Sequence, residues 1–225
     1  EAADRFPAGR CLTTGNPVRA AFAGQAPPYP PSSGGPLRVL VFGGSRGART
    51  LNRAAAEAAA TWAGRAGLEL LIQTGPADHA GTEAAFTAAG ADPQRVRVVP
   101  YIDDMASALA AADLVVCRAG AMTLAELQAA GRPAVLVPFP FATDDHQRRN
   151  AESCAAAGAA EVLLDADCDG PALVKTVDVL LGNRDRLMAM ARAARGLARP
   201  DAARAIARDL LTIVGRPAGT TAPTP

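Results

Sequence analysis

The sequence predicts an α/β fold, a Rossmann-like, doubly wound parallel sheet of six strands. From Leu37 onward, short apolar segments alternate with longer helical patterns. The segment Leu-Val-Val-Cys at 114–117 is apolar throughout, which suits a strand that is covered on both faces. A helix follows each expected strand, and βα units in series give parallel strands with right-handed crossovers.

The expected elements follow one another closely along the chain. Strands are predicted at 37–42, 68–73, 95–99, 113–117, 134–138 and 160–164, and helices at about 48–63, 77–89, 103–111, 122–130, 145–157 and 171–181. Asp103 and Asp104 place negative charge in the first turn of one helix, where the helix dipole favours it. Gly131 and Pro133 end another helix. Two further helices, broken at Arg199-Pro200, are predicted in 183–214.

The predicted domain organisation has one folded unit with shorter segments around it. The folded domain is expected to span 37–215. Residues 1–19 contain no strand–helix unit and are interpreted as the trailing end of a preceding domain. Residues 20–36 are rich in Pro, Gly and Ser and are expected to form a semi-rigid, extended linker. Residues 216–225 are expected to be a disordered tail.

Composition narrows the class of protein. A net charge of +1 and an aromatic content of 4% give no reason to expect nucleic acid binding. The four cysteines form no C-x-x-C pair, and with only two histidines we expect buried thiols rather than a zinc site. No signal peptide and no apolar stretch of membrane-spanning length is visible, so we expect a soluble cytoplasmic protein.

The C-terminal part of the chain is basic. Between 184 and 208 it carries seven Arg against two Asp. A solvated helix face is the favoured interpretation. The alternative is a surface that meets an anionic membrane leaflet.

The stretch after the fourth expected strand has the clearest chemistry. The chain turns at Gly120 and restarts as a helix, which presents free backbone N–H groups and the positive end of a helix dipole above the sheet. Thr123 adds a hydroxyl in the first turn. Three residues later, Glu126 offers a carboxylate that suits the hydroxyls of a sugar. We therefore expect phosphate at the turn and ribose at Glu126.

Two other strand-end loops contribute candidates. The loop 43–48, Gly-Gly-Ser-Arg-Gly-Ala, is neither G-x-G-x-x-G nor a P-loop, and alone it is equally well a tight turn. Together with the Gly120 turn it favours phosphate binding, with Ser45 as a hydrogen-bond donor. After the third strand, the backbone at Ile102 could read the edge of a base, although a plain connection capped by Asp103 is more common. The residues after the second strand, Gln73-Thr74-Gly75, are interpreted as a turn.

The loop after the fifth expected strand is long, polar and rich in proline. Loops of this kind inside an α/β domain usually serve function. His146 and Gln147 suit sugar hydroxyls. Helix capping by Asp144 or Asp145 is the alternative, and both can hold together.

Five motifs, taken in order, resemble the MurG family of peptidoglycan N-acetylglucosaminyltransferases, which has the GT-B fold. They are Gly-Asn-Pro-Val-Arg at 15–19, Gly-Gly-Ser-x-Gly-Ala at 43–48, Tyr-Ile-Asp-Asp-Met at 101–105, Arg-Ala-Gly-Ala-Met-Thr-x-x-Glu at 118–126 and Asp-Asp-His-Gln-x-x-Asn-Ala at 144–151. The resemblance covers the C-terminal, donor-binding half of the family's fold, and residues 152–214 match by element pattern.

The resemblance implies a site for UDP-N-acetylglucosamine, the donor of this family. Arg19 and Ser45 would lie near the phosphates, the Ile102 backbone at uracil, Glu126 at the ribose and Gln147 at the N-acetylglucosamine. The start of the helix would cradle the diphosphate. The implied set is Arg19, Ser45, Ile102, Ala121, Met122, Thr123, Leu124, Ala125, Glu126 and Gln147, with Gly44 and His146 as further candidates.

The resemblance also implies the reaction and its partners. The acceptor would be lipid I, the product lipid II, and the anomeric carbon would be inverted, at the cytoplasmic face of a bacterial membrane and by a peripheral protein. We expect no metal and no cofactor, because a helix dipole and N–H groups can stabilise departing UDP. Asp165-Ala-Asp167 has D-x-D spacing but is expected away from the other motifs. No catalytic base is assigned, since the family's acceptor groove lies in the other half.

Three interpretations of function stay open. The chain is the donor half of such a transferase, a donor-binding subunit that acts only with a partner chain, or a non-catalytic UDP-sugar sensor. Related GT-B enzymes that modify glycolipids or antibiotics are less favoured, because of the motifs at 15–19 and 101–105.

Overall fold

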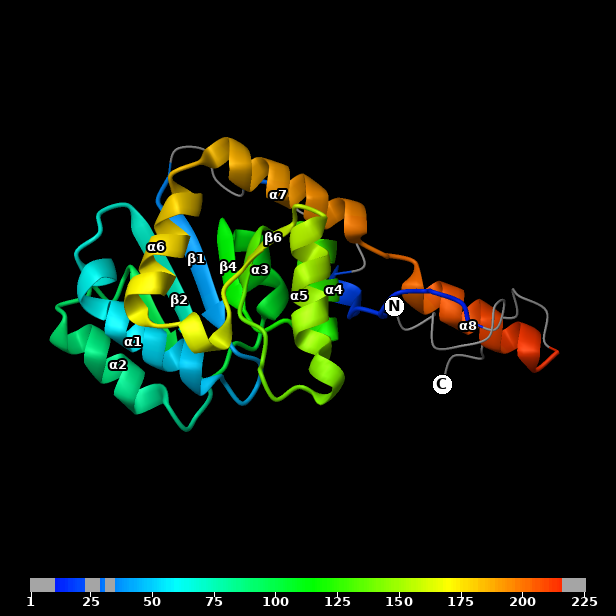
Figure 1. Cartoon of the computed structure of the whole chain (residues 1–225), viewed down its shortest axis with the longest axis horizontal. Coiled ribbons are helices and arrows are strands. Elements are labelled where there is room, and N and C mark those ends of the chain that lie inside the picture. The colour runs from blue at the N-terminus through cyan, green and yellow to red at the C-terminus, as the bar shows by residue number, and fades with distance from the viewer. Residues whose placement is uncertain (1–10, 23–28, 31–34, 216–225) are drawn as a thin grey trace.

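The computed structural model describes residues 11–22, 29–30 and 35–215 (Figure 1). The expected tail at 216–225, most of the expected linker and residues 1–10 lie outside these described residues.

A parallel sheet of six strands forms the centre of the domain, in the order β3-β2-β1-β4-β5-β6. Phe42 at the end of β1 pairs with Gln73 on β2 and with Cys117 on β4, so these three strands end level with one another. The predicted sheet is confirmed. Its strands are β1 Leu37–Phe42, β2 Leu68–Gln73, β3 Val96–Val99, β4 Leu114–Cys117, β5 Ala134–Leu136 and β6 Ala160–Val162.

The helices also lie where the sequence predicts them, to within a few residues at each end. They are α1 Arg49–Ala63, α2 His79–Ala88, α3 Met105–Ala111, α4 Ala121–Ala130, α5 His146–Ala156, α6 Gly170–Leu181, α7 Arg184–Leu197 and α8 Ala202–Ile213. Strand β5 ends earlier than predicted, just before Val137 and Pro138, because proline has no N–H for a ladder. Gly131 ends α4 as predicted, in a left-handed conformation with φ 61°.

Alternate side chains of the strands serve two cores, one on each face of the sheet. Val39 and Val41 point to the face that α1, α2 and α6 cover. Leu40 and Phe42 point to the opposite face, which α3, α4 and α5 cover. Both faces are buried, which explains why the central strands are mostly apolar and why β4 is apolar throughout.

The last two helices differ in how they contact the domain. Helix α7 packs on α4 and α6, whereas α8 extends away from the sheet (Figure 1). The predicted break at Arg199-Pro200 separates them. Within the described residues, no helix combines the length and the apolar character needed to cross a bilayer.

Part of the expected linker packs on the domain. Ala20–Phe22 form a short 3-10 turn, and Phe22 is only 6% exposed. The Tyr29 hydroxyl donates to the carbonyl of Asp113 at 2.8 Å, and the Arg132 guanidinium lies 5.4 Å from the centre of the Tyr29 ring. The expectation of an extended linker is therefore wrong at Ala20–Phe22, where the chain turns and the Phe22 ring packs into the core.

Candidate functional site

The loops that carry the predicted site gather at the carboxyl edge of the sheet. The strand order reverses between β1 and β4, and in open parallel sheets ligands bind at this switch point. The loop from Gly43 to Ala48 follows β1, and the Arg118–Gly120 turn follows β4. Since Phe42 and Cys117 pair directly, the two loops start beside each other.

Helix α4 begins at this edge with its N-terminus uncapped. Gly120 is the N-cap residue and offers no side chain, and the first helical bond runs from the N–H of Leu124 to the carbonyl of Gly120 at 2.9 Å. The N–H groups of Ala121, Met122 and Thr123 therefore precede the helical ladder. Together with the helix dipole they favour an anion at this point.

Two positions of the β1–α1 loop favour glycine for different physical reasons. A Cβ on Gly47 would lie 1.7 Å from the carbonyl oxygen of Thr74, so this glycine permits contact with the β2–α2 connection. Gly44 has φ +91°, and a Cβ there would face open space. Its backbone conformation alone favours glycine and leaves the loop accessible. Ser45, the predicted phosphate donor, is exposed next to it.

Gln73 joins two of the site's loops, a role that the sequence analysis missed. Its Nε2 donates to the carbonyl of Gly44 at 2.9 Å, and its Oε1 accepts the N–H of Ile102 at 2.9 Å. The peptide predicted to read a base thus has its N–H in use, and the carbonyl oxygen of Ile102 is left for a ligand. A polar residue directly after the apolar run Leu70–Ile72 was the available signal.

Glu126 and Arg19 are bonded to each other. Arg19 donates from Nε at 3.2 Å and from Nη2 at 3.1 Å to Oε1 of Glu126. Asn16, three residues before Arg19, donates to the carbonyl of Ala121 at 3.2 Å. The segment before the domain thereby lies along α4 and brings its arginine to the predicted ribose position.

The β5–α5 loop holds Gln147 and His146 through the backbone. The N–H of Phe139 donates to Oε1 of Gln147 at 3.1 Å, and Nδ1 of His146 lies 2.7 Å from the carbonyl of Thr143. Asp144 and Asp145 have φ of 52° and 53°, a conformation that is strained for residues with a side chain. Asp145 makes no side-chain cap to α5, so capping does not explain that residue.

Arg118 connects the loops that follow β4, β5 and β6. It donates to the carbonyls of Val137 at 3.2 Å and Pro138 at 3.3 Å, and it pairs with Asp165. The expectation that Asp165 lies away from the other motifs is wrong, because β6 ends at the same edge of the sheet. Asp165 also accepts the Thr50 hydroxyl at 3.1 Å, so it joins α1 to this edge.

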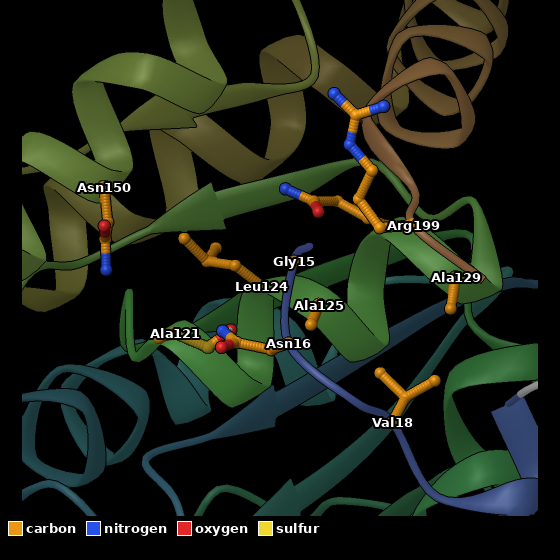
Figure 2. A pocket seen from close by; sticks show the side chains of 10 residues that line it. Gly15, Asn16, Val18, Ala121, Leu124, Ala125, Ala129, Asn150 and Arg199 are labelled. Atoms are coloured by element: carbon orange, nitrogen blue, oxygen red, sulfur yellow. The ribbon is translucent and has the colours of Figure 1, made fainter. Parts of the chain in front are cut away.

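A pocket of about 190 Å³ lies along one side of α4, as Figure 2 shows. It contains Ala121, Leu124 and Ala125 of the predicted set. Leu124 is also part of the core, so its side chain is largely covered. Ser45, Ile102 and Gln147 are not among the pocket's lining residues, and they belong to loops around the open edge of the sheet. The pocket is completed by Gly15, Asn16, Val18, Gln128, Ala129, Asn150 and Arg199.

Asn150 links the pocket to the β4–α4 turn. It projects from α5 (Figure 2), and its amide donates to the carbonyl of Ala119 at 3.1 Å. Asn150 belongs to the motif at 144–151, but the sequence alone indicates no role for it. Its bond fixes the turn from which α4 starts.

The acidic residues near α3 serve structure. Asp104, not Asp103 as predicted, caps this helix, since its carboxylate accepts the N–H and the hydroxyl of Ser107. Both hydrogen bonds lower the pKa of Asp104, and the bond from the Ser107 hydroxyl has the larger effect. In the described part of the chain, no group of three or more His, Cys, Asp or Glu could hold a metal ion.

The sequence matches the glycosyltransferase family 28 C-terminal domain over residues 38–206. Among curated proteins, a transferase from Solibacter usitatus is 45% identical over 219 residues, covering 96% of this chain and 58% of the relative. A relative from Xanthomonas euvesicatoria is 50% identical over 203 residues, covering 89% of this chain and 46% of the relative. Both are named UDP-N-acetylglucosamine–N-acetylmuramyl-(pentapeptide) pyrophosphoryl-undecaprenol N-acetylglucosamine transferase.

The structure is similar to the crystal structure of MurG from Acinetobacter baumannii. The two share 33% sequence identity with a TM-score of 0.77, over 92% of this chain and 57% of the other. The chain thus spans about half of the length of the relatives it matches. The matched family model is that of the C-terminal domain.

Proposed function

Because this chain belongs to glycosyltransferase family 28, through the C-terminal domain of that family, we propose that it is the half of the enzyme that binds UDP-N-acetylglucosamine. Its parallel six-stranded sheet is that of the C-terminal half of a GT-B glycosyltransferase. The whole enzyme would transfer N-acetylglucosamine to lipid I and give lipid II, as in peptidoglycan synthesis. This proposal follows the activity for which its relatives are named.

The observation that carries the proposal is the uncapped start of α4 at the switch point of the sheet. Gly120 supplies no capping atom, so the N–H groups before the helical ladder are directed to the site. One turn further on, Glu126 presents its carboxylate on the same helix. A diphosphate at the helix start and a ribose at Glu126 fit one nucleotide along α4.

The remaining contacts follow from the other loops. The carbonyl oxygen of Ile102 would accept the N3–H of uracil, and the exposed Tyr101 beside it offers a ring for the base. Ser45 would donate to a phosphate oxygen. Gln147 has its Oε1 engaged by Phe139, so its amide N–H groups are those that would donate to the sugar.

The chemistry of this half is the departure of UDP. The acceptor hydroxyl oxygen would form a bond to the anomeric carbon of the donor sugar, from the face opposite UDP, so the configuration inverts. The bond from that carbon to the phosphate oxygen breaks, and its electron pair stays on UDP. The N–H groups of α4 would stabilise this charge, an effect that often contributes most to such reactions. The hydroxyl proton leaves to a base that we assign to no residue of this chain.

The proposed partners follow from the separation of donor binding and acceptor binding between two domains. UDP-N-acetylglucosamine would bind to this chain directly. Lipid I would bind through a second, acceptor-side domain, and the assembled enzyme would be peripheral on the cytoplasmic face of a bacterial membrane. The alternatives that stay open are a donor-binding subunit for a partner chain and a UDP-sugar sensor without catalysis.

Saturation-transfer NMR of the chain tests the donor directly. UDP-N-acetylglucosamine, UDP-glucose and UDP-galactose are compared at equal concentrations. We expect transfer to the uracil and ribose protons of all three, and additional transfer to the acetyl methyl group with the tightest binding for the first. Equal binding of all three sugars would contradict the proposed donor.

A complementation assay separates the transferase from the sensor. The acceptor-side domain of a relative, such as the one from Solibacter usitatus, is added to the chain with lipid I and labelled donor. Transfer of label to the lipid is the expected result for a donor half or a donor subunit. Donor binding without transfer would support the sensor.

A further inference from the structure

The buried amide of Gln73 occupies a special place in the sheet. It ends β2, the strand between β1 and β3, and its side chain is 2% exposed. The carbonyl of Gly44 can only accept a hydrogen bond and the N–H of Ile102 can only donate one. These partners therefore fix which end of the amide is oxygen and which is nitrogen.

We propose that Gln73 is a positioning residue for nucleotide recognition. It holds the phosphate-side loop, residues 43–48, and the base-side loop, which contains Ile102, at a fixed separation. The inference rests on the proposed function, in which Ser45 serves a phosphate and Ile102 serves the base. Both polar ends of Gln73 are used inside the protein, so it acts through these loops and not by touching the donor.

The phosphate-side loop contains glycines, so it needs a contact that restricts its conformational freedom. Gly44 is left-handed, with φ +91° and open space where a side chain would be. Glycine has the largest conformational freedom to lose when it is ordered. A hydrogen bond from Gln73 to its carbonyl restricts that freedom before the ligand arrives, and preorganisation of this kind strengthens binding.

The base-side loop gains a defined hydrogen-bonding face. The N–H of Ile102 is satisfied by Gln73 at 2.9 Å, which leaves its carbonyl oxygen as an acceptor for the base. Uracil presents an N3–H donor, whereas cytosine has a bare acceptor at the same ring position. Without Gln73 the N–H would be free and the loop could turn, so the distinction between the two bases would weaken.

Asn52 provides a matched comparison within the same fold. It too is a buried amide, and its Nδ2 donates to the carbonyl of Thr74 at 2.8 Å and to Asp78 at 2.9 Å. It joins α1 to the β2–α2 connection and contacts neither Gly44 nor Ile102. Its loss should cost stability of the same kind without disturbing the spacing between the two ligand loops.

The experiment measures binding of UDP, CDP and inorganic diphosphate to the full chain by calorimetry. Gln73→Met keeps the length of the side chain and removes both hydrogen bonds. We expect affinity for UDP to fall by about tenfold or more, and the preference for UDP over CDP to shrink toward equality. Diphosphate alone should lose only about two- to threefold, because it uses one loop. Asn52→Leu should lower the melting temperature and leave the UDP-to-CDP ratio as in the wild type.

Gln73→Glu gives a rescue that depends on pH. A protonated carboxyl has one donor and one acceptor, like the amide, whereas the ionised form has acceptors only and faces the carbonyl of Gly44. Burial raises the pKa of such a carboxyl. Relative to the wild type at the same pH, affinity for UDP and preference over CDP should therefore recover between about pH 8 and pH 5.5.

The outcomes separate this inference from the proposal on which it rests. A wild-type chain that binds no UDP overturns the proposed function and the inference with it. If the wild type binds UDP, a Gln73→Met variant that keeps the UDP-to-CDP ratio overturns the inference alone and leaves Gln73 a purely structural residue. If that variant fails to fold, Gln73→Glu decides: recovery of the ratio at low pH supports the inference, and a flat ratio overturns it.

Discussion

Arg19 bonds to Glu126 across 107 positions of sequence, and two of its nitrogens, Nε and Nη2, donate to one carboxylate oxygen. The motifs in the sequence predict separate roles for these residues, the arginine at phosphate and the glutamate at ribose. The structure shows that the two side chains form an ion pair with each other. Ribose would therefore compete with the guanidinium for Oε1 of Glu126, and release of Arg19 would free its charge for the phosphates.

Arg19→Ala should change the binding of uridine and of UDP in opposite directions. Uridine should bind more tightly by up to about 1 kcal/mol, because the ion pair between the exposed Arg19 and the partly buried Glu126 no longer has to be broken. UDP should bind more weakly by about 1–3 kcal/mol, since it loses a charged hydrogen bond. Titration calorimetry measures both. Arg204→Ala is the control, because Arg204 also forms an exposed ion pair, with Asp201, but on α8. A loss for both ligands would show that Arg19 does not compete for Glu126.

Glu126→Ala should weaken binding of UDP by about 1–3 kcal/mol if the carboxylate holds ribose hydroxyls. The loss should be much smaller for 2′,3′-dideoxy-UDP, which lacks the hydroxyls. A thermal melt of the same variant controls for folding, and little change is expected because the partner Arg19 is 56% exposed. Equal losses for both nucleotides would remove the ribose role of Glu126.

The fold could be predicted because its signals are local. Apolar runs, a glycine turn at Gly120 and a left-handed helix end at Gly131 each act within a few residues. The predicted strand ends agree with the structure at β1 and β2. The exceptions are also local. The Asp103-Asp104 pair offers two possible caps, and only the geometry selects Asp104.

The site could be predicted only in part, because the contacts that hold its loops depend on which strands are neighbours in the sheet. The importance of Gln73 arises from the position of β2 between β1 and β3, which no local pattern reveals. Asp165 meets Arg118 because the chain returns to the same edge of the sheet after β6. The predicted donor residues remain predictions. The structure adds the residues that hold their loops, namely Gln73, Arg118 and Asn150.

The cysteines should differ sharply in reactivity. Cys11 is exposed, whereas Cys117, Cys154 and Cys168 are buried. Burial raises the pKa of the Cys168 thiol to about 11, and it also raises the pKa of Cys117 and Cys154. Iodoacetamide at about pH 8 should therefore modify Cys11 quickly and the other thiols only on unfolding. Mass spectrometry of the native chain checks this, and Cys11→Ser should abolish the fast reaction. Rapid modification of a buried thiol would contradict the structure.

The same pKa shift predicts an alkaline limit of stability. The folded chain binds the Cys168 proton more tightly than the unfolded chain, whose thiol has a pKa of 9.0. The resulting stabilisation is complete below that value and is lost as pH rises through about 11. Denaturant unfolding at several pH values should show this decline, and Cys168→Ala should reduce it. An unchanged slope in that variant would place its origin elsewhere.

Donor binding should not depend on a divalent metal, because backbone N–H groups at α4 are expected to neutralise the diphosphate. Calorimetric titration of UDP-N-acetylglucosamine with and without EDTA makes the comparison. The two affinities should agree within about twofold. A signal that disappears on chelation would overturn the expectation.

A capping side chain at position 120 should stabilise the fold and weaken the binding of UDP. It has φ −67° and ψ 143° at the N-cap of α4, a conformation that suits a capping residue, and a Cβ there would meet only the Thr123 hydroxyl, at 3.7 Å. Gly120→Asp should therefore fold, with unfolding free energy raised by about 0.3–1 kcal/mol through the cap and the dipole. The new carboxylate would occupy the N–H groups that a diphosphate needs and would repel its charge, so UDP affinity should fall by at least about tenfold.

Two companion variants identify the cause of that loss. Gly120→Asn places an uncharged capping oxygen at the same position, so it should lose the part of the affinity that depends on occupied N–H groups and keep the part that depends on charge. Gly120→Ala offers no oxygen and should bind UDP more tightly than either. Denaturant unfolding and calorimetry on the same samples give the two quantities. If Gly120→Asp stabilises the chain and still binds UDP like the wild type, the phosphate does not lie at the start of α4, because one set of N–H groups cannot serve both carboxylate and phosphate.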